Sequence, residues 1–233
     1  MKRILSKIKK TMCVLCSAAI VFSLPATAAD NSFEKAGEEI FEKKSYDIVF
    51  DQPAADSIDG WKNSSLPLGN GYFGANVFGG TQKERIQITE PTLWTGSSAY
   101  IENRYSAGME SFADIYINFD HDEKNVKNYR RSLNLDSAVA KTEYELEGVK
   151  YAREYFTSYP ARVMAVKITA DNPGALDFTV APQIPGLHTY LEKEGDGKGK
   201  SGEVKALGDE IIIKGNSQYY NIDYEGILKI TSD

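Results

Sequence analysis

The pattern of hydrophobic and polar positions changes near residue 45. Before it, Phe33, Ile40 and Phe41 are spaced as one narrow face of a helix, which predicts a short N-terminal helix or arm. Beyond Tyr46 the chain consists of short runs rich in β-branched and aromatic residues, each bounded by turn residues. These runs predict about ten strands, at 46–50, 72–78, 84–88, 113–119, 139–146, 149–156, 162–169, 175–180, 210–215 and 224–230.

The middle of the chain gives the clearest strand signal. Two runs rich in Val, Tyr and Thr, 139–146 and 149–156, flank Glu147-Gly148, a two-residue connection typical of a tight hairpin. No long helical pattern follows residue 45. The sequence therefore predicts an all-β fold, a large antiparallel β-sandwich of two sheets packed face to face, preceded by a short N-terminal arm or helix.

The first 28 residues have the pattern of a secretory signal peptide. A cationic start is followed by an apolar run of 13 residues at 12–24 and by the small residues Ala26-Thr27-Ala28. The rival interpretation is a membrane anchor, but a spanning helix needs roughly 20 apolar residues. We expect cleavage after Ala28, secretion, and no membrane association afterwards. The predicted organisation is a signal peptide at 1–28, a polar arm at 29–45 and a sandwich domain at 46–233.

Cysteine usage and charge narrow the chemistry. Cys13 and Cys16 both lie in the predicted signal peptide, so the mature chain is expected to lack a disulfide and a thiolate metal site. Removal of five basic and no acidic residues would take the formal charge from −6 to −11. That balance argues against nucleic acid as a partner. We expect no cofactor and no metal.

Two glycine-rich segments resemble phosphate-binding loops. Gly69, Gly71 and Gly74 have the G-x-G-x-x-G spacing of a dinucleotide turn, and Gly199-Lys200-Ser201 ends like a P-loop. Both motifs require a following helix, whereas strand-like sequence follows each of them here. We therefore predict a tight turn before a strand for the first segment and a solvated loop at 195–202 for the second.

Carboxylates and histidines are the residue types that could serve catalysis or metal binding. The segment "FDHDE" at 119–123 is predicted to be a solvated turn, because its acidic groups lack calcium-loop spacing, and His188 a loop residue. Paired carboxylates of a glycoside hydrolase must lie about 5–10 Å apart across a sugar. By residue type the candidates are Glu84, Glu90, Asp114, Asp136 and Glu154. The alternative role for each is a charge at a strand end or the partner of an arginine.

The segment from Trp61 to Gly96 resembles the N-terminal domain of glycoside hydrolase family 95, the inverting α-L-fucosidases and their relatives. The shared features are a tryptophan, L-P-L-G-N-G, G-A, F-G-G, an E-R-I-Q strand and an E-x-T-L-W-x-G ending, in that order. The resemblance implies a secreted glycoside hydrolase acting on terminal α-linked fucosyl or similar sugars of glycans. It also implies that the catalytic residues lie in an (α/α)6 barrel following this domain, so none is carried over to this chain.

Asn70, Glu90 and Trp94 are the candidate functional residues, expected to face the barrel or the rim of the substrate cleft. The alternative roles are turn capping by Asn70, an internal ion pair of Glu90 and core packing of Trp94. The run at 224–230 still has a strand pattern close to Asp233, which predicts that the domain is incomplete at its C-terminus; a terminal edge strand is the alternative. The rival function is a free-standing carbohydrate-binding or interaction module, in which Trp61, Trp94 and several of the 14 tyrosines provide flat surfaces for sugars.

Overall fold

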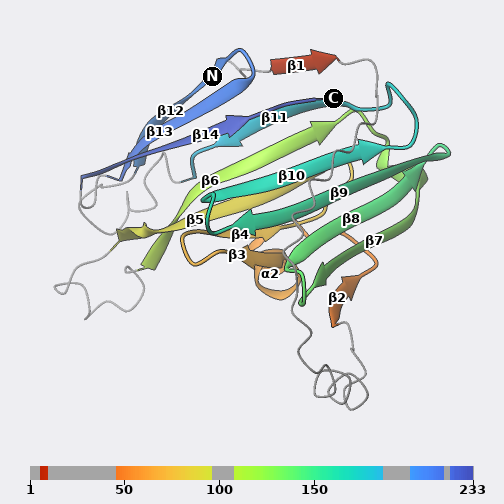
Figure 1. The fold of residues 1–233 in the computed structure, drawn as a ribbon, viewed down its shortest axis with the longest axis horizontal. Coiled ribbons are helices and arrows are strands. Elements are labelled where there is room, and N and C mark those ends of the chain that lie inside the picture. Colours follow the sequence, from red (N-terminus) through yellow and green to blue (C-terminus); the bar gives the residue numbers. More distant parts are fainter. Residues whose placement is uncertain (1–5, 10–45, 96–107, 186–199, 218–220, 233) are drawn as a thin grey trace, which may run out of the picture.

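The computed structural model describes residues 6–9, 46–95, 108–185, 200–217 and 221–232. Within these ranges the chain is nearly all antiparallel β-structure, arranged in three sheets (Figure 1). None of the helices there has the length and apolar character needed to cross a bilayer. The predicted helix or arm at 29–45 and the predicted loop residue His188 lie outside the described residues.

The largest sheet forms one layer of the sandwich and has the order β1-β11-β6-β5-β4-β3. Its strands are β1 (Ser6–Lys9), β3 (Leu66–Gly69), β4 (Gly74–Val77), β5 (Lys83–Thr95), β6 (Gly108–Phe119) and β11 (Asp177–Gln183). β1, which pairs with β11, belongs to the segment predicted to be a signal peptide. The signal peptide and its cleavage after Ala28 stay predictions.

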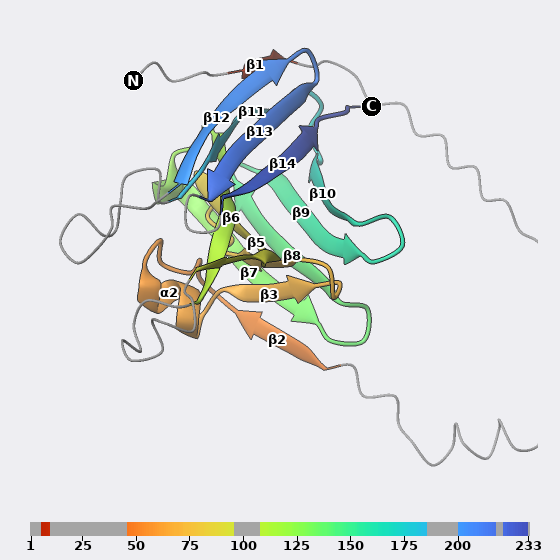
Figure 2. The ribbon, with the colours of Figure 1, turned by 90° about the vertical axis from the view of Figure 1, so that its left-hand side faces the viewer.

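The second and third sheets cover the first (Figure 2). The five-stranded sheet has the order β10-β9-β8-β7-β2, and the three-stranded sheet the order β12-β13-β14. The strands of the five-stranded sheet are β2 (Asp47–Phe50), β7 (Val126–Asn134), β8 (Val139–Leu146), β9 (Val149–Ser158) and β10 (Val163–Ala170). Those of the small sheet are β12 (Lys200–Leu207), β13 (Glu210–Ser217) and β14 (Ile222–Lys229).

The predicted all-β sandwich is confirmed, and the β8–β9 hairpin shows how locally it is encoded. In β8 alternate residues are buried, namely Ala140, Thr142, Tyr144 and Leu146. Glu147 and Gly148 both have positive φ, 53° and 82°, as a type I′ turn requires. Each predicted strand overlaps an observed strand.

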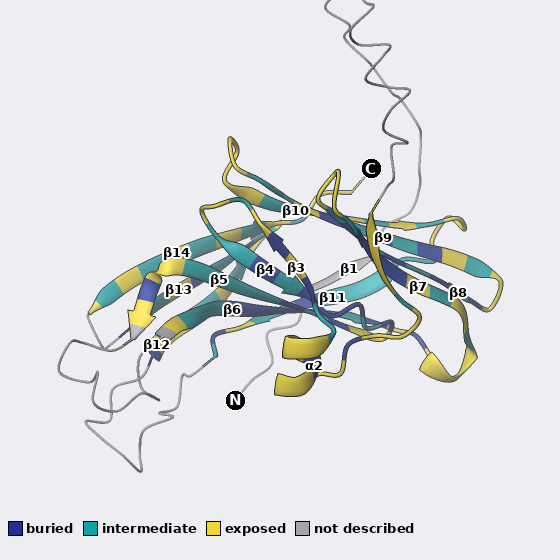
Figure 3. Ribbon diagram, turned by 90° about the horizontal axis from the view of Figure 1, so that it is seen from below, coloured by how far each residue is buried: buried dark blue, intermediate teal, exposed yellow. Residues whose placement is uncertain are grey.

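Several elements were not predicted as strands or helices. They are β1, β3, β7, the first residues of β12, the short helix α2 (Ile58–Asn63) and the 3₁₀ turn η2 (Glu123–Asn125). β7 lacks an apolar alternation because Arg131 and Ser132 are among its buried side chains. α2 is mostly exposed, in contrast to the buried positions along the strands beside it (Figure 3).

The prediction of a solvated loop at 195–202 is wrong where the structure describes it, because Lys200–Gly202 begin β12. The Lys200 ammonium is buried, donates to the Ser111 carbonyl and lies 3.7 Å from a carboxylate oxygen of Glu110. Burial lowers the pKa of Lys200, and Glu110 partly opposes this. The lysine of the P-loop-like motif therefore fastens the small sheet to β6.

Candidate functional site

The F-G-G motif and Glu84 form one buried polar centre between the two large sheets. One Glu84 carboxylate oxygen accepts hydrogen bonds from the backbone amides of Phe78 and Gly79, at 3.2 and 2.8 Å. The other accepts from the Tyr155 hydroxyl at 2.9 Å and lies 3.0 Å from an Arg153 nitrogen. The ion pair is almost entirely removed from solvent, with side chains 0% and 1% exposed.

The arginine completes the centre from β9. Arg153 donates to the Gly80 carbonyl at 2.7 Å. The ion pair of Arg153 and Glu84 therefore links β9 and β5 to the turn at Phe78-Gly79-Gly80, the F-G-G corner. Burial lowers the pKa of Arg153, but Tyr155 and Glu84 raise it and the net shift is upward. Burial also raises the pKa of Tyr155 well above its ordinary value, which keeps its hydroxyl a donor to Glu84.

The glycines of this corner are required by close packing. Gly79 has a φ of 76°, and a Cβ there would lie 2.6 Å from the Tyr129 hydroxyl oxygen. A Cβ on Gly80 would lie 2.0 Å from the Lys83 carbonyl oxygen. In the first glycine motif only Gly71, with a φ of 79°, requires the left-handed region, since Cβ atoms on Gly69 and Gly74 would make ordinary contacts.

The G-x-G-x-x-G segment forms the tight connection from β3 to β4, and Asn70 shapes it. Its side-chain oxygen accepts from the amides of Tyr72 and Phe73, both at 2.9 Å. Its side-chain nitrogen donates to the carbonyl of Ser158, at the end of β9, at 2.9 Å. Asn70 therefore caps the turn and also links the two layers. The predicted tight turn before a strand is confirmed, because β4 follows it and not the helix that a dinucleotide-binding turn requires.

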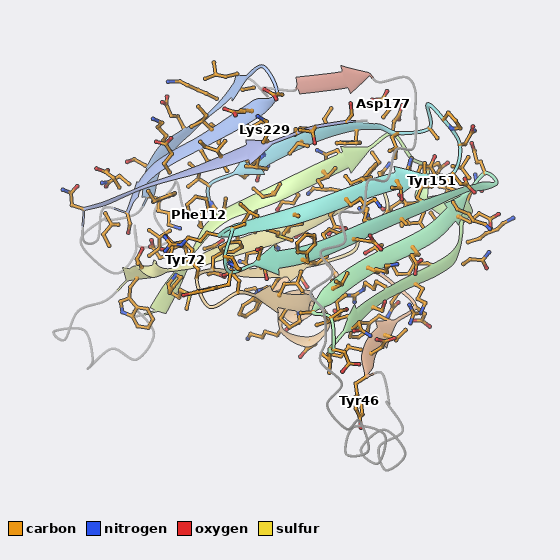
Figure 4. The ribbon with its side chains drawn as sticks, viewed as in Figure 1. Tyr46, Tyr72, Phe112, Tyr151, Asp177 and Lys229 are labelled. Carbon is orange, nitrogen blue, oxygen red and sulfur yellow. The ribbon has the colours of Figure 1, made fainter. Side chains whose placement is uncertain are left out.

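Next to this turn an arginine stacks on an aromatic ring. The Arg162 guanidinium lies 5.0 Å from the centre of the Tyr72 ring, within the range of a cation–π contact. Tyr72 is 42% exposed and lies at the same end of the sandwich as Phe112 (Figure 4). Sequence reasoning did not single out either Tyr72 or Arg162, because the β9–β10 turn brings them together from positions far apart in the chain.

Glu90 lies in an irregular part of β5. The pairing with β6 shifts between Ile88 and Thr89 and again between Thr89 and Trp94. Such a bulge accommodates Pro91, which cannot donate a ladder hydrogen bond. The Glu90 carboxylate accepts from the Thr92 amide at 2.9 Å and from the Thr92 hydroxyl. Its described contacts are thus local hydrogen bonds and not the internal ion pair that was considered.

Beyond the bulge, neighbouring side chains alternate between core and solvent. Leu93 is 1% exposed, whereas Trp94 is 47% exposed and is paired across the sheet with Met109. Core packing therefore does not account for Trp94. Glu90 and Tyr72 line the same cleft, which also contains Arg162, while Trp94 lies farther along β5 and is not among the lining residues.

The remaining carboxylate candidates have basic partners or are exposed. Asp114 pairs with Arg85 at 3.0 Å, and Glu154 with Lys141 at 2.8 Å. The sequence had suggested Arg153 as the partner of Glu154, but successive strand residues face opposite sides, and Arg153 points into the core. Asp136 is exposed in a turn, and its suggested partners, Arg130 and Arg131, contact other groups.

The segment at 119–123 differs from the predicted solvated turn. His121 is buried against the Phe119 and Tyr151 rings, and its Nδ1 lies 3.1 Å from the Tyr144 hydroxyl oxygen. Burial lowers the pKa of this imidazole. Asp122 does cap a turn, accepting from the Lys124 amide at 3.1 Å. Within the described ranges no cluster of three His, Cys, Asp or Glu residues could hold a metal ion.

These contacts define an antiparallel β-sandwich domain whose motif residues brace its two layers. The family model described as "Glycosyl hydrolase family 65, N-terminal domain" matches residues 48–109 and 99–233, so the chain belongs to that family of domains. The predicted identity as the N-terminal domain of a glycoside hydrolase is thus confirmed, while the finer assignment to family 95 stays a prediction.

Two curated relatives are similar over part of the chain. "Alpha-L-fucosidase 2" of Arabidopsis thaliana is 33% identical over 150 residues, which cover 50% of this chain and 18% of the relative. "Probable alpha-fucosidase A" of Aspergillus oryzae is 25% identical over 145 residues, covering 46% of this chain and 20% of the relative. The aligned part thus corresponds to about a fifth of each relative's length.

Proposed function

We propose that this chain is the N-terminal β-sandwich domain of a secreted, inverting glycoside hydrolase that releases terminal α-linked fucosyl or similar sugars from glycans. The observation that carries the proposal is the family match over 48–109 and 99–233, together with two relatives named as fucosidases. The aligned part represents 18% and 20% of those relatives. The catalytic groups are then supplied by a helical barrel in the rest of the polypeptide.

In this proposal the sandwich is a rigid support for the barrel. The bond from Asn70 to Ser158 fixes the end of the sandwich where the β3–β4 and β9–β10 turns meet. The ion pair of Glu84 and Arg153 fixes the β4–β5 turn to β9. Trp94 is exposed without a core role, which favours contact with the barrel or the substrate rim. Glu90, held in a bulge beside the cleft, is the second candidate for that contact.

The direct test is an activity assay of this chain by itself. The purified chain is incubated with 2'-fucosyllactose, and free fucose is measured against a heat-inactivated sample. We expect no release above that blank, because the catalytic groups are assigned to the missing barrel. Release that scales with the amount of folded chain would refute the assignment of this domain as a non-catalytic support.

A second candidate function is a free-standing carbohydrate-binding module. It is favoured by large aromatic side chains that are well exposed, among them Trp61 at 41%, Tyr72 at 42% and Trp94 at 47%. Aromatic rings provide flat apolar surfaces for sugar rings. Affinity electrophoresis in a fucosylated polysaccharide distinguishes the binding module from the support domain. A binding module is retarded by the polysaccharide, and Trp94→Ala reduces that retardation. A support domain migrates at the same rate with and without the polysaccharide.

A further inference from the structure

The layer facing the six-stranded sheet is interrupted between β14 and β10. β10 ends the order of the five-stranded sheet, and β14 ends the order of the three-stranded sheet. Within the described residues, neither strand is paired on its outer edge. Figures 1 and 2 show both sheets on the same side of the large sheet, so the two free edges belong to one discontinuous layer.

The interruption is an apolar cleft of about 1290 Å³. β10 lines it with Met164, Val166 and Ile168, and the other wall includes Leu228 and Ile230, at the end of β14 and just beyond it. These side chains also pack against the buried core, so the cleft is an opening into the core. Pockets for small molecules measure about 300–1,000 Å³ and place a few polar groups around the ligand. The size and the apolar walls favour a larger, apolar occupant.

The direction of the strands specifies what fits there. β10 and β14 run the same way across the layer (Figure 1), so a single strand can be antiparallel to both. β12, β13 and β14 are joined in order as antiparallel neighbours. The next strand of such a series lies beside β14, and sequential strands are usually neighbours. Ile230, Thr231 and Ser232 line the cleft, so the chain leaves β14 at its entrance.

We propose that the cleft is the seat of one further β-strand, antiparallel to β14 and β10, which the polypeptide following β14 supplies in the full-length protein. Its inward side chains are apolar and alternate with polar ones, because its inner face meets Val166 and Leu228 and its outer face meets solvent. The strand joins the five- and three-stranded sheets into one layer and satisfies the free edges of both. This goes beyond the hydrolase assignment and rests on the proposed function in one respect, namely that further polypeptide follows β14.

The test extends the chain in a form that supplies the strand. An Asn-Gly turn and a segment of about eight residues alternating valine and threonine are appended after Asp233. The control has the same composition shifted by one residue, which turns the valines outward. Cys13 and Cys16 are replaced by serine. Single probes are introduced as Val166→Cys inside the cleft and as Ala165→Cys on the opposite face of β10, which does not line the cleft.

The readouts are the rate of maleimide labelling and the thermal midpoint. With the in-register strand, Val166→Cys is expected to label about tenfold more slowly while the labelling rate of Ala165→Cys is unchanged. The thermal midpoint of the chain without probes is expected to rise by about 5–10 °C. If Val166→Cys perturbs folding, Ile168→Cys replaces it, because it lies on the same face two residues along.

Three results would overturn the proposal. If the in-register and shifted strands slow the labelling of Val166→Cys equally, the added segment does not pair in the proposed register. Unchanged labelling with the in-register strand would mean that the cleft does not accept a strand. Protection of Val166→Cys in the unextended chain that increases with concentration, together with a dimer in light scattering, would assign the cleft to a second copy of the chain.

Discussion

Replacing Glu84 by glutamine tests the most consequential contact of the fold. The Glu84 carboxylate accepts from two backbone amides of the F-G-G corner and from Tyr155, and it neutralises Arg153. Glu84→Gln keeps the size of the side chain and one acceptor oxygen. Its new amide group must face either the Arg153 guanidinium or the corner amides, all of which are donors, so at least one favourable contact becomes a donor–donor contact.

The size of the effect follows from the burial of the pair. Because both side chains are almost fully inaccessible, the variant leaves the Arg153 charge in the core without its counter-ion. Removal of one partner of a buried ion pair costs about 3–5 kcal/mol. For a domain of this length that corresponds to a fall of about 6–20 °C in the thermal midpoint.

Urea denaturation followed by circular dichroism measures the change, and the chain offers a matched control. Glu154→Gln removes an ion pair with Lys141 on the solvent side of the five-stranded sheet, the sheet that contains Arg153. The Glu154 and Lys141 side chains there are 38% and 40% exposed. Exposed pairs contribute about 0–1 kcal/mol. Adding Arg153→Met to Glu84→Gln removes the unpaired charge and should recover part of the loss. The reasoning is refuted if Glu84→Gln costs no more than Glu154→Gln.

Three further predictions concern other parts of the domain. Burial lowers the pKa of His121, so on acidification the unfolded chain takes up a proton at this imidazole before the folded chain does, and stability falls below pH 6.5. His121→Gln should reduce the change of the urea midpoint between about pH 7 and 5, and parallel pH profiles of the two proteins would contradict this. Gly80→Ala should lower the free energy of unfolding by about 1–3 kcal/mol, because its Cβ would meet the Lys83 carbonyl. Gly71→Ala, strained only in φ, should lower it less, and a larger loss for Gly71→Ala in urea denaturation would contradict the close packing at Gly80. Trp94→Ala should change stability by no more than about 0.5 kcal/mol yet reduce fucose release by a full-length enzyme, while equal losses in both assays would indicate a packing role.

The strands that could be predicted are those with local signals. The β8–β9 hairpin combines alternation with a Glu147-Gly148 turn, and both are visible in the sequence. β7 was not predicted as a strand because its inward positions include Arg131, whose guanidinium donates to the carbonyls of Gln52 and Ser64. A buried polar side chain hides the strand period, and only the partners far along the chain explain it.

Some residues of the candidate site were identified from the sequence, but their contacts were not. Asn70 was identified together with its turn-capping role, whereas its bond to Ser158 depends on how the two layers stack. Glu84 was considered as one carboxylate among several, and its burial beside Arg153 follows from the pairing of β5 and β9 with different sheets. Tyr72 and Arg162 carry no local motif, so their contact required the three-dimensional structure.

The proposal that this domain supports a catalytic barrel is tested most directly in the Arabidopsis thaliana relative, Alpha-L-fucosidase 2. Fucose release from 2'-fucosyllactose is measured for that enzyme, for a variant lacking the segment that aligns with this chain, and for a chimera carrying this chain's residues in its place. The account predicts that the deletion abolishes release and that the chimera restores it. Full activity of the deletion variant, produced as a folded protein, would contradict the account.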